Sequence, residues 1–120
     1  MLETTVQPGT NIVTLDYHGG LTVEDEQRMR QVLDEVLRNH DSVRMLAVIG
    51  PVDVSAVEPK AVWMDLKAAG YLKRADRLAV VSDGAWVSKL AEWTAELAHV
   101  SVRTFPADQR TSALAWITQP

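Results

Sequence analysis

The sequence predicts an α/β fold in which helices pack on a mixed β-sheet. Short apolar runs that are typical of strands alternate with longer segments of helical periodicity along the chain. The first two strand-like segments are separated only by a turn, which predicts an antiparallel hairpin before the alternation begins. The expected element order is therefore β-β-α-β-α-β-α-β-α, and helical crossovers should make the later strands parallel.

The first elements should be a hairpin and a long amphipathic helix. Val6 precedes a Pro-Gly turn pair, and the alternating apolar residues of NIVTLDYHG predict the second strand. Thr22 stands three residues before Asp25, the spacing of a capping box, so a helix should run from about 23 to 39. Its apolar residues recur at the helical period and should face the core: Met29, Val32, Leu33, Val36 and Leu37.

A buried strand and a shorter helix should come next. RMLAVI is a nearly continuous apolar run, typical of a strand that is covered on both faces. After the loop GPVDVSAVEPK, Pro59 suits the first turn of a helix, where the missing N–H would have no partner anyway. Gly70 should end this helix, and Val62, Leu66 and Ala69 should form its buried face.

The last third of the chain repeats the pattern. RLAVVS is predicted to be another buried strand, and Asp83 to be the N-cap of the helix after it. VSVRTF is the last predicted strand, and Asp108 should cap a final helix that directs Leu114 and Ile117 inward. The helix after Asp83 carries the strongest apolar stripe in the chain: Trp86, Leu90, Trp93 and Leu97.

Composition narrows the class of protein. With 120 residues, 47% of them hydrophobic and 23% charged, the chain is expected to form one globular domain over residues 1–120. A net charge of -4 gives no basic excess, so nucleic acid is not an expected partner. The absence of cysteine excludes disulfides and thiolate chemistry. Neither a signal-peptide pattern nor a transmembrane run is present, so a cytoplasmic location is expected.

The polar residues form no recognisable catalytic constellation. VVSDGAW lies at the carboxyl end of a predicted strand, where sheets of this class bind ligands. Its lone glycine does not make a phosphate loop, and Ser82 lacks the G-x-S-x-G setting of a nucleophile. The carboxylates near the second crossover cluster only loosely: Asp53, Glu58 and Asp65. The histidines lack metal-ligand spacing: His18, His40 and His99. Neither an enzyme nor a bound metal or cofactor is expected.

Trp63 differs from the other tryptophans in its setting. Trp86 and Trp93 belong to the apolar stripe and are expected in the core. Trp63 falls at the margin of the buried face of its helix, close to the loop 51–59. An amphipathic indole there can anchor a partner protein, an apolar ligand or a lipid surface, and the alternative is a rim residue that covers the core.

Five segments match the pattern of a known family in their order and spacing. They are GGLTVED (19–25), AVWMDLKAA (61–69), RLAVVSDGAW (77–86), VRTF (102–105) and ALAWI (113–117). The chain thus resembles the SpoIIAA-like family, small relatives of the STAS domain of bacterial anti-sigma-factor antagonists and transporter tails. The resemblance implies a sheet with helices packed on it and a regulatory role exerted by binding rather than by catalysis.

The resemblance also directs attention to one hydroxyl group. In anti-sigma-factor antagonists, a Ser or Thr of an Asp-Ser-Ser-Gly-like segment at the helix start after the third strand is phosphorylated by the partner kinase. The corresponding stretch here, PVDVSAVEPKAVW, lacks that segment, and Glu58-Pro59-Lys60 occupies the helix start. Ser55 is the nearest hydroxyl, and its phosphorylation is left open.

Two functions follow from these observations. The first is a non-enzymatic STAS-like regulatory module that binds a partner protein or a second copy of itself as a homodimer. The second is a carrier or sensor of an apolar small molecule or lipid, with a pocket beneath the helices that carry Trp63 and Trp86. The expected interaction or ligand surface comprises Trp63, Asp53, Ser55, Asp83 and Trp86.

Overall fold

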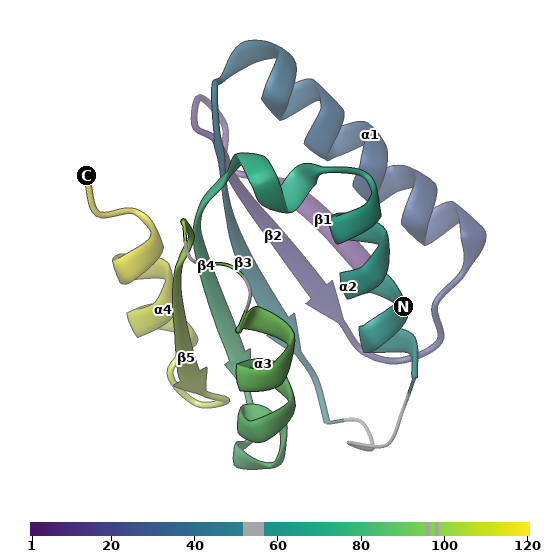
Figure 1. Ribbon diagram of the computed structural model, residues 1–120, viewed down its shortest axis with the longest axis vertical. Coiled ribbons are helices and arrows are strands. Elements are labelled where there is room, and N and C mark those ends of the chain that lie inside the picture. The colour runs from purple at the N-terminus through teal and green to yellow at the C-terminus, as the bar shows by residue number, and fades with distance from the viewer. Residues whose placement is uncertain (52–56, 96, 98) are drawn as a thin grey trace.

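Five strands form one mixed sheet in the order β1-β2-β3-β4-β5 (Figure 1). The computed structural model describes residues 1–51, 57–95, 97 and 99–120. Strands β1 and β2 pair antiparallel and all later neighbours pair parallel, so the predicted hairpin and the predicted element order are confirmed. The strands are β1 (Leu2–Val6), β2 (Ile12–Tyr17), β3 (Val43–Ile49), β4 (Ala75–Ser82) and β5 (Ser101–Pro106). The helices are α1 (Val23–Asn39), α2 (Glu58–Ala68), α3 (Val87–Thr94) and α4 (Arg110–Ile117), with 3-10 turns η1 (Tyr71–Arg74) and η2 (Gly84–Trp86).

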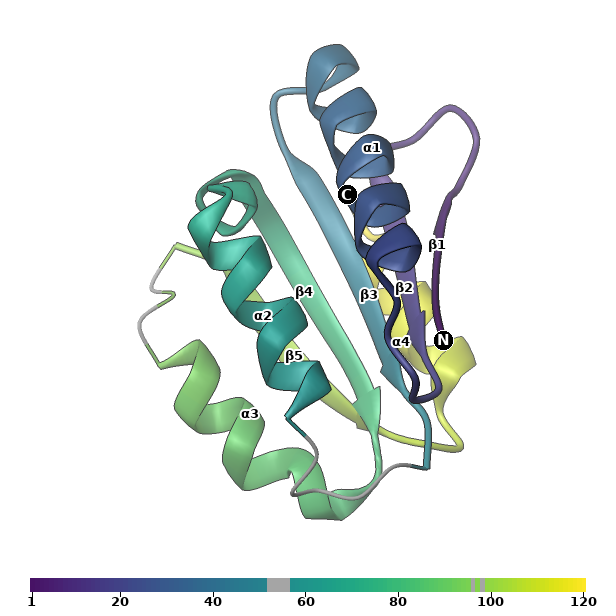
Figure 2. The same ribbon diagram turned by 90° about the vertical axis from the view of Figure 1, so that its right-hand side faces the viewer.

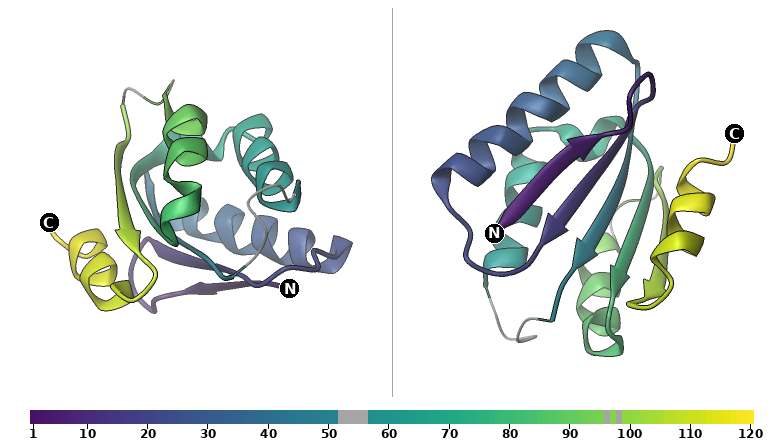
Figure 3. Two further views of the ribbon diagram at one scale, coloured as in Figure 1. Left: turned by 90° about the horizontal axis from the view of Figure 1, so that it is seen from below. Right: turned by 180° about the vertical axis from the view of Figure 1, so that it is seen from behind.

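The helices divide unequally between the two faces of the sheet. Because successive parallel strands are added in one direction through right-handed crossovers, α1, α2 and α3 all fall on the same face. Helix α4 follows the last strand and lies on the opposite face, as Figure 2 and both views of Figure 3 show. No helix in the described part of the chain is long and apolar enough to cross a membrane.

Each face of the sheet has its own core. Side chains alternate along β4, so that Val80 points into the larger core beneath α1–α3 and Val81 into the smaller core beneath α4. Members of the larger core with the least exposure include Val13, Met29, Leu33, Val43, Met45 and Trp86. The smaller core comprises Ile12, Leu46, Ala79, Val81, Phe105, Ala113 and Ile117.

Helix α1 begins where the sequence predicts and also protects the edge of the sheet. Thr22 Oγ1 accepts from the N–H of Asp25, and Asp25 Oδ2 accepts from the N–H of Thr22, which completes the predicted capping box. The same Asp25 oxygen accepts the N–H of Leu2 at 3.2 Å, on the outer side of edge strand β1. Thr4, in the middle of β1, is buried against this helix. The first turn of α1 therefore occupies part of a strand edge that would otherwise be open to pairing.

Two predictions about helix faces and one about a helix cap were wrong. Ala69 is exposed because α2 ends at Ala68, and Ala69 is the C-cap ahead of Gly70, which has a φ of 82°. Asp108 does not cap α4, whose N-cap position is Gln109 with no side-chain cap. Leu114 is 42% exposed. Helix α4 instead turns Ala113 and Ile117 inward, since these two residues fit against the close-packed Ala79 and Val81 of β4.

Candidate functional site

A narrow cavity of about 70 Å³ lies between helices α2 and α3 and the sheet. Its floor is formed by strands β2, β3 and β4, and its walls by the inward faces of the two helices. The lining is almost wholly apolar. It comprises Leu2, Leu15, Tyr17, Ala47, Val48, Ile49, Pro59, Val62, Trp63, Leu66, Leu78, Val80, Leu90 and Trp93. A space of this chemistry holds water poorly, because a buried water needs two to four polar partners.

Two stacked tryptophans line the cavity between the helices. Trp63 of α2 and Trp93 of α3 have ring centroids 6.4 Å apart and an interplanar angle of 27°. Both are partly buried and pack against the larger core. Trp86, the last residue of η2 just before α3, meets Trp93 edge-on, with ring centroids 5.9 Å apart and an interplanar angle of 63°. The indole pair therefore joins α2 to α3 and forms part of the cavity wall.

Tyr17 lines the cavity and is tied through its hydroxyl to helix α2. The Tyr17 hydroxyl donates to Oε1 of Glu58, in the first turn of α2, at 2.6 Å. Glu58 also accepts the backbone N–H groups of Leu21 at 2.9 Å and Gly20 at 3.3 Å. These donors, the Tyr17 hydroxyl first, hold the pKa of Glu58 below its usual value. Burial, and then the bond to Glu58, raise the pKa of Tyr17. One carboxylate thus fastens the end of β2, the loop before α1 and the start of α2.

A second set of polar contacts joins α1 to α2 and to the 3-10 turn η1 that follows it. Arg30 Nη2 lies 3.3 Å from Oδ1 of Asp65. Glu26 shares a hydrogen bond with Asp65, which raises the pKa of Glu26. The Tyr71 hydroxyl donates to Oδ1 of Asp34 at 2.7 Å, and burial followed by this bond raises the pKa of Tyr71 to about 12. The sequence analysis grouped Glu58 and Asp65 in one loose carboxylate cluster. In the structure they bind different groups: Glu58 bonds to Tyr17 and the loop before α1, and Asp65 contacts Arg30 and Glu26 of α1.

Comparison with known proteins assigns the family. The family model described as SpoIIAA-like matches residues 12–118, which is most of the chain. The chain belongs to the SpoIIAA-like family. Searches of curated proteins and of solved structures found no match. The suspected family and the STAS-like α/β fold are thereby confirmed, and the SpoIIAA-like chain is a STAS-type regulatory domain.

The described residues of the predicted interaction surface lie in different surroundings. Trp63 lies in the wall of the cavity, and Asp83 is exposed at the carboxyl end of β4. Asp83 accepts the N–H of Ala85 at 3.0 Å and so caps the 3-10 turn η2 rather than α3 itself, whose N-cap position is Trp86. Trp86 is fully buried, as the core interpretation predicted. Asp53 and Ser55 lie outside the described residues of this SpoIIAA-like domain.

The other candidate side chains have structural partners. Ser82 is buried, and its hydroxyl donates to the carbonyl of Asp83 at 3.3 Å. His99 Nε2 lies 3.0 Å from the carbonyl oxygen of Leu72, and His40 is the C-cap of α1. His18 Nε2 lies 3.9 Å from Asp16, whose carboxylate already forms a two-bond pair with Arg110. Within the described ranges, these groups do not converge on a common point.

Sequence reasoning missed Trp93 and Tyr17 as members of the site. The apolar stripe of α3 placed Trp93 in the core but could not reveal its partner, because Trp63 lies on another helix. Tyr17 ends a strand with regular alternation, and nothing local distinguishes it from an ordinary core residue. One signal in the sequence could have pointed to this contact: Glu58 is the acidic residue in the first turn of α2, and the N-cap position of this helix, Val57, has no side-chain cap.

Proposed function

We propose that this STAS-type domain binds an apolar small molecule or the hydrocarbon chain of a lipid in the cavity between α2, α3 and the sheet. The observation that carries the proposal is the almost wholly apolar lining of that cavity. Each methylene group that leaves water for such a lining contributes about 0.8 kcal/mol to binding. A domain of this kind acts as a carrier or sensor and does so without catalysis, in the cytoplasm.

The lining also defines what the ligand must look like. Because the Tyr17 hydroxyl is already bonded to Glu58, the floor of the cavity has no free polar side-chain group among the residues that the structure describes. A polar atom carried into the cavity would lose its hydrogen bonds to water without replacement. Because the cavity measures only about 70 Å³, less than half of the roughly 150 Å³ that holds benzene, we expect a short unsubstituted alkyl segment to enter, with the rest of the ligand and any charged head group outside.

Intrinsic tryptophan fluorescence tests this proposal. Titration with octanoate, dodecanoate and hexadecanoate should give saturable changes because Trp63 and Trp93 line the cavity, and the affinity should differ little among the three because only a short end of each chain can enter a space of about 70 Å³. Replacing Trp63 or Trp93 by Phe should remove most of the signal. The matched control is Trp116→Phe, since Trp116 packs on the opposite face of the sheet and its loss should leave the signal intact. Equal changes in all three variants, or no saturation with any chain length, would contradict the proposal.

A protein partner is the second candidate function, and exposed apolar side chains near the cavity favour it. Val57, just before α2, is 74% exposed, and Met64 on α2 is 52% exposed. Together with Trp63 they give α2 an apolar surface on which a partner protein, or a second copy of the chain, could gain binding energy. Asp53 and Ser55 precede this helix in sequence and belong to the same proposed surface.

Light scattering over a concentration series tests the homodimer form of this second candidate. Met64→Lys should lower the molar mass at high concentration, and Leu114→Lys is the control because Leu114 is an exposed apolar residue on α4. A monomer at every concentration would contradict self-association.

Phosphorylation of Ser55 is tested separately by incubation with a cognate kinase and intact-mass measurement. An unchanged mass would contradict phosphorylation of this residue.

A further inference from the structure

Strand β5 forms the edge of the sheet opposite β1. It pairs with β4 along its whole length, from Ser101 to Pro106, which satisfies the main-chain groups on its inner side. Beyond the sheet, the carbonyl of Pro106 accepts the N–H of Gln109 at 2.9 Å. Among the residues that the structure describes, no other main-chain group of β5 has a hydrogen-bond partner outside the sheet. The outward N–H and C=O groups of this strand are therefore available for pairing.

The sequence of β5 does little to discourage such pairing. Edge strands are usually protected by several charged side chains, by proline or by a bulge. Strand β5 carries one charged side chain, Arg103, and its proline is its last residue. Its pairing with β4 is regular from end to end. The exposed Thr104 and the half-buried Val102 are β-branched residues, which strands favour.

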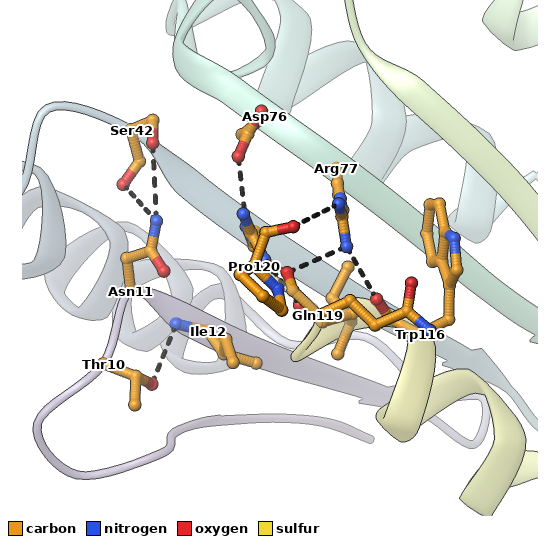
Figure 4. A network of polar contacts seen from close by, with 11 residues as sticks. Thr10, Asn11, Ile12, Ser42, Asp76, Arg77, Trp116, Gln119 and Pro120 are labelled. Carbon is orange, nitrogen blue, oxygen red and sulfur yellow. Dashed lines mark hydrogen bonds and ion pairs between the residues drawn. The ribbon is translucent and has the colours of Figure 1, made fainter.

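The neighbouring helices leave the middle of β5 exposed. Figure 3 shows α3 and α4 on opposite faces of the sheet beside this strand. Arg77 of β4 donates to the carbonyl of Trp116 at 2.9 Å and lies over its ring (Figure 4). The same ring lies 6.2 Å from that of Phe105 of β5. These contacts hold α4 over β4 as well as β5, and Arg103 and Thr104 remain exposed.

A second copy of the chain can pair with this edge about a two-fold axis. In a symmetric antiparallel pair, one residue must face its own copy across the axis, because outward groups must meet outward groups. An axis at Arg103 would bring two guanidinium groups directly opposite each other, which is destabilising. An axis at Thr104 brings two hydroxyl-bearing side chains together, a favourable cross-strand pair, and places Arg103 opposite the uncharged Phe105 of the second copy. An axis at any other residue pairs a shorter part of the strand.

We propose that two copies of the chain join through β5 as antiparallel neighbours, with Thr104 on the two-fold axis. The paired segment is 102–106, and the sheets of the two copies become continuous. Strand β5 does not contribute to the lining of the cavity, so this dimer goes beyond the proposed ligand function and does not depend on it. Because the paired segment is short, the dimer should be weak and should appear as the protein concentration rises.

Single-cysteine variants test the register, since the chain itself contains no cysteine. In the proposed dimer, the two copies of residue 104 face each other with Cα atoms about 4.5–5.5 Å apart, a separation that a disulfide spans. Thr104→Cys should therefore give a covalent dimer under mild oxidation, seen as a doubled intact mass. Ser101→Cys is the control on the same strand. The two copies of residue 101 would lie roughly 20 Å apart, so cross-linking should be at least roughly tenfold slower.

A charge on the axis tests the pairing without cysteine. Thr104→Lys would place two ammonium groups opposite each other and should weaken self-association by roughly tenfold or more, measured by sedimentation equilibrium over a concentration series. The matched control is Thr5→Lys, because Thr5 is also an exposed threonine within an edge strand, β1. It should leave self-association unchanged. Thermal melting checks that both variants fold.

These measurements report on β5 alone. A cross-link at residue 104 requires the two β5 strands to meet, so its result is separate from self-association through α2. Equal cross-linking of Thr104→Cys and Ser101→Cys, or equal weakening by Thr104→Lys and Thr5→Lys, would overturn the proposal. The molar mass of a single chain for the unchanged protein throughout the concentration series would do so as well.

Discussion

The same substitution at two adjacent residues of β4 should have opposite effects on stability. Val80 is buried beneath α1–α3 and lines the cavity, whereas Val81 is equally buried beneath α4, in the smaller core. Val80→Ile adds one methylene beside empty space. Val81→Ile adds the same group where Ile117, Ala113 and Phe105 already fill the space.

The magnitudes follow from burial and packing. One further buried methylene at Val80 stabilises the fold by about 0.8 kcal/mol. Overpacking at Val81 costs about 1–3 kcal/mol. At about 2.1 cal/mol/K per residue, 120 residues give an unfolding entropy of about 250 cal/mol/K. The melting temperature should therefore rise by about 3 °C for Val80→Ile and fall by about 4–12 °C for Val81→Ile.

Differential scanning calorimetry of the two variants beside the unchanged chain measures this difference. The two proteins serve as each other's controls, because the residue type, the strand and the added atoms are identical. If Val80→Ile melts lower than the parent by as much as Val81→Ile does, the space beside Val80 is not available, and the argument for an apolar ligand loses its support. Fatty-acid titration of Val80→Ile should also show weaker binding, since the added group occupies the ligand space.

The other predictions concern the anchors of the helices. Glu58→Gln should destabilise the domain near neutral pH. The difference from the parent should begin to shrink as the pH falls below 4.5, the usual pKa of a glutamate, and should be lost once the pH falls through the lowered pKa of Glu58 in the folded protein; chemical denaturation at several pH values measures it. Ile117→Ala should cost about 2–5 kcal/mol and Leu114→Ala much less, because only the first side chain is buried; comparable losses in urea denaturation would contradict the assigned face of α4. Asp83→Ala should cost about 1 kcal/mol through loss of the cap on η2, whereas Asp83→Asn should restore most of it.

The sequence predicted helix ends and buried faces correctly where residues close together in the chain determine them. Thr22 and Asp25 predicted the start of α1 because a capping box uses only residues three positions apart in the sequence. The apolar stripe that runs from η2 into α3 correctly predicted that Trp86 and Leu90 are buried, because apolar residues recur there at the helical period and polar residues lie between them. In α4, by contrast, ALAWI is apolar at every position, so the buried face depends on which side chains fit against β4.

The candidate site could be predicted only in part. Trp63 stood out because it lies at the margin of an amphipathic helix, but its stacking on Trp93 and the cavity behind them depend on the spacing of two helices over the sheet. The bond between Tyr17 and Glu58 joins residues 41 positions apart, a distance at which a single sequence offers no pairing signal. Such contacts follow from tertiary packing.

The contact between Asp25 and Leu2 has a consequence for assembly. A sheet with two open edges can add copies of itself indefinitely and grow into a filament. Here the side of β1 away from β2 is occupied by the first turn of α1, while β5 at the other edge carries no comparable cap among the described residues. Copies that joined through β5 would present to a third copy only β1 edges that α1 partly occupies, which disfavours growth beyond a pair.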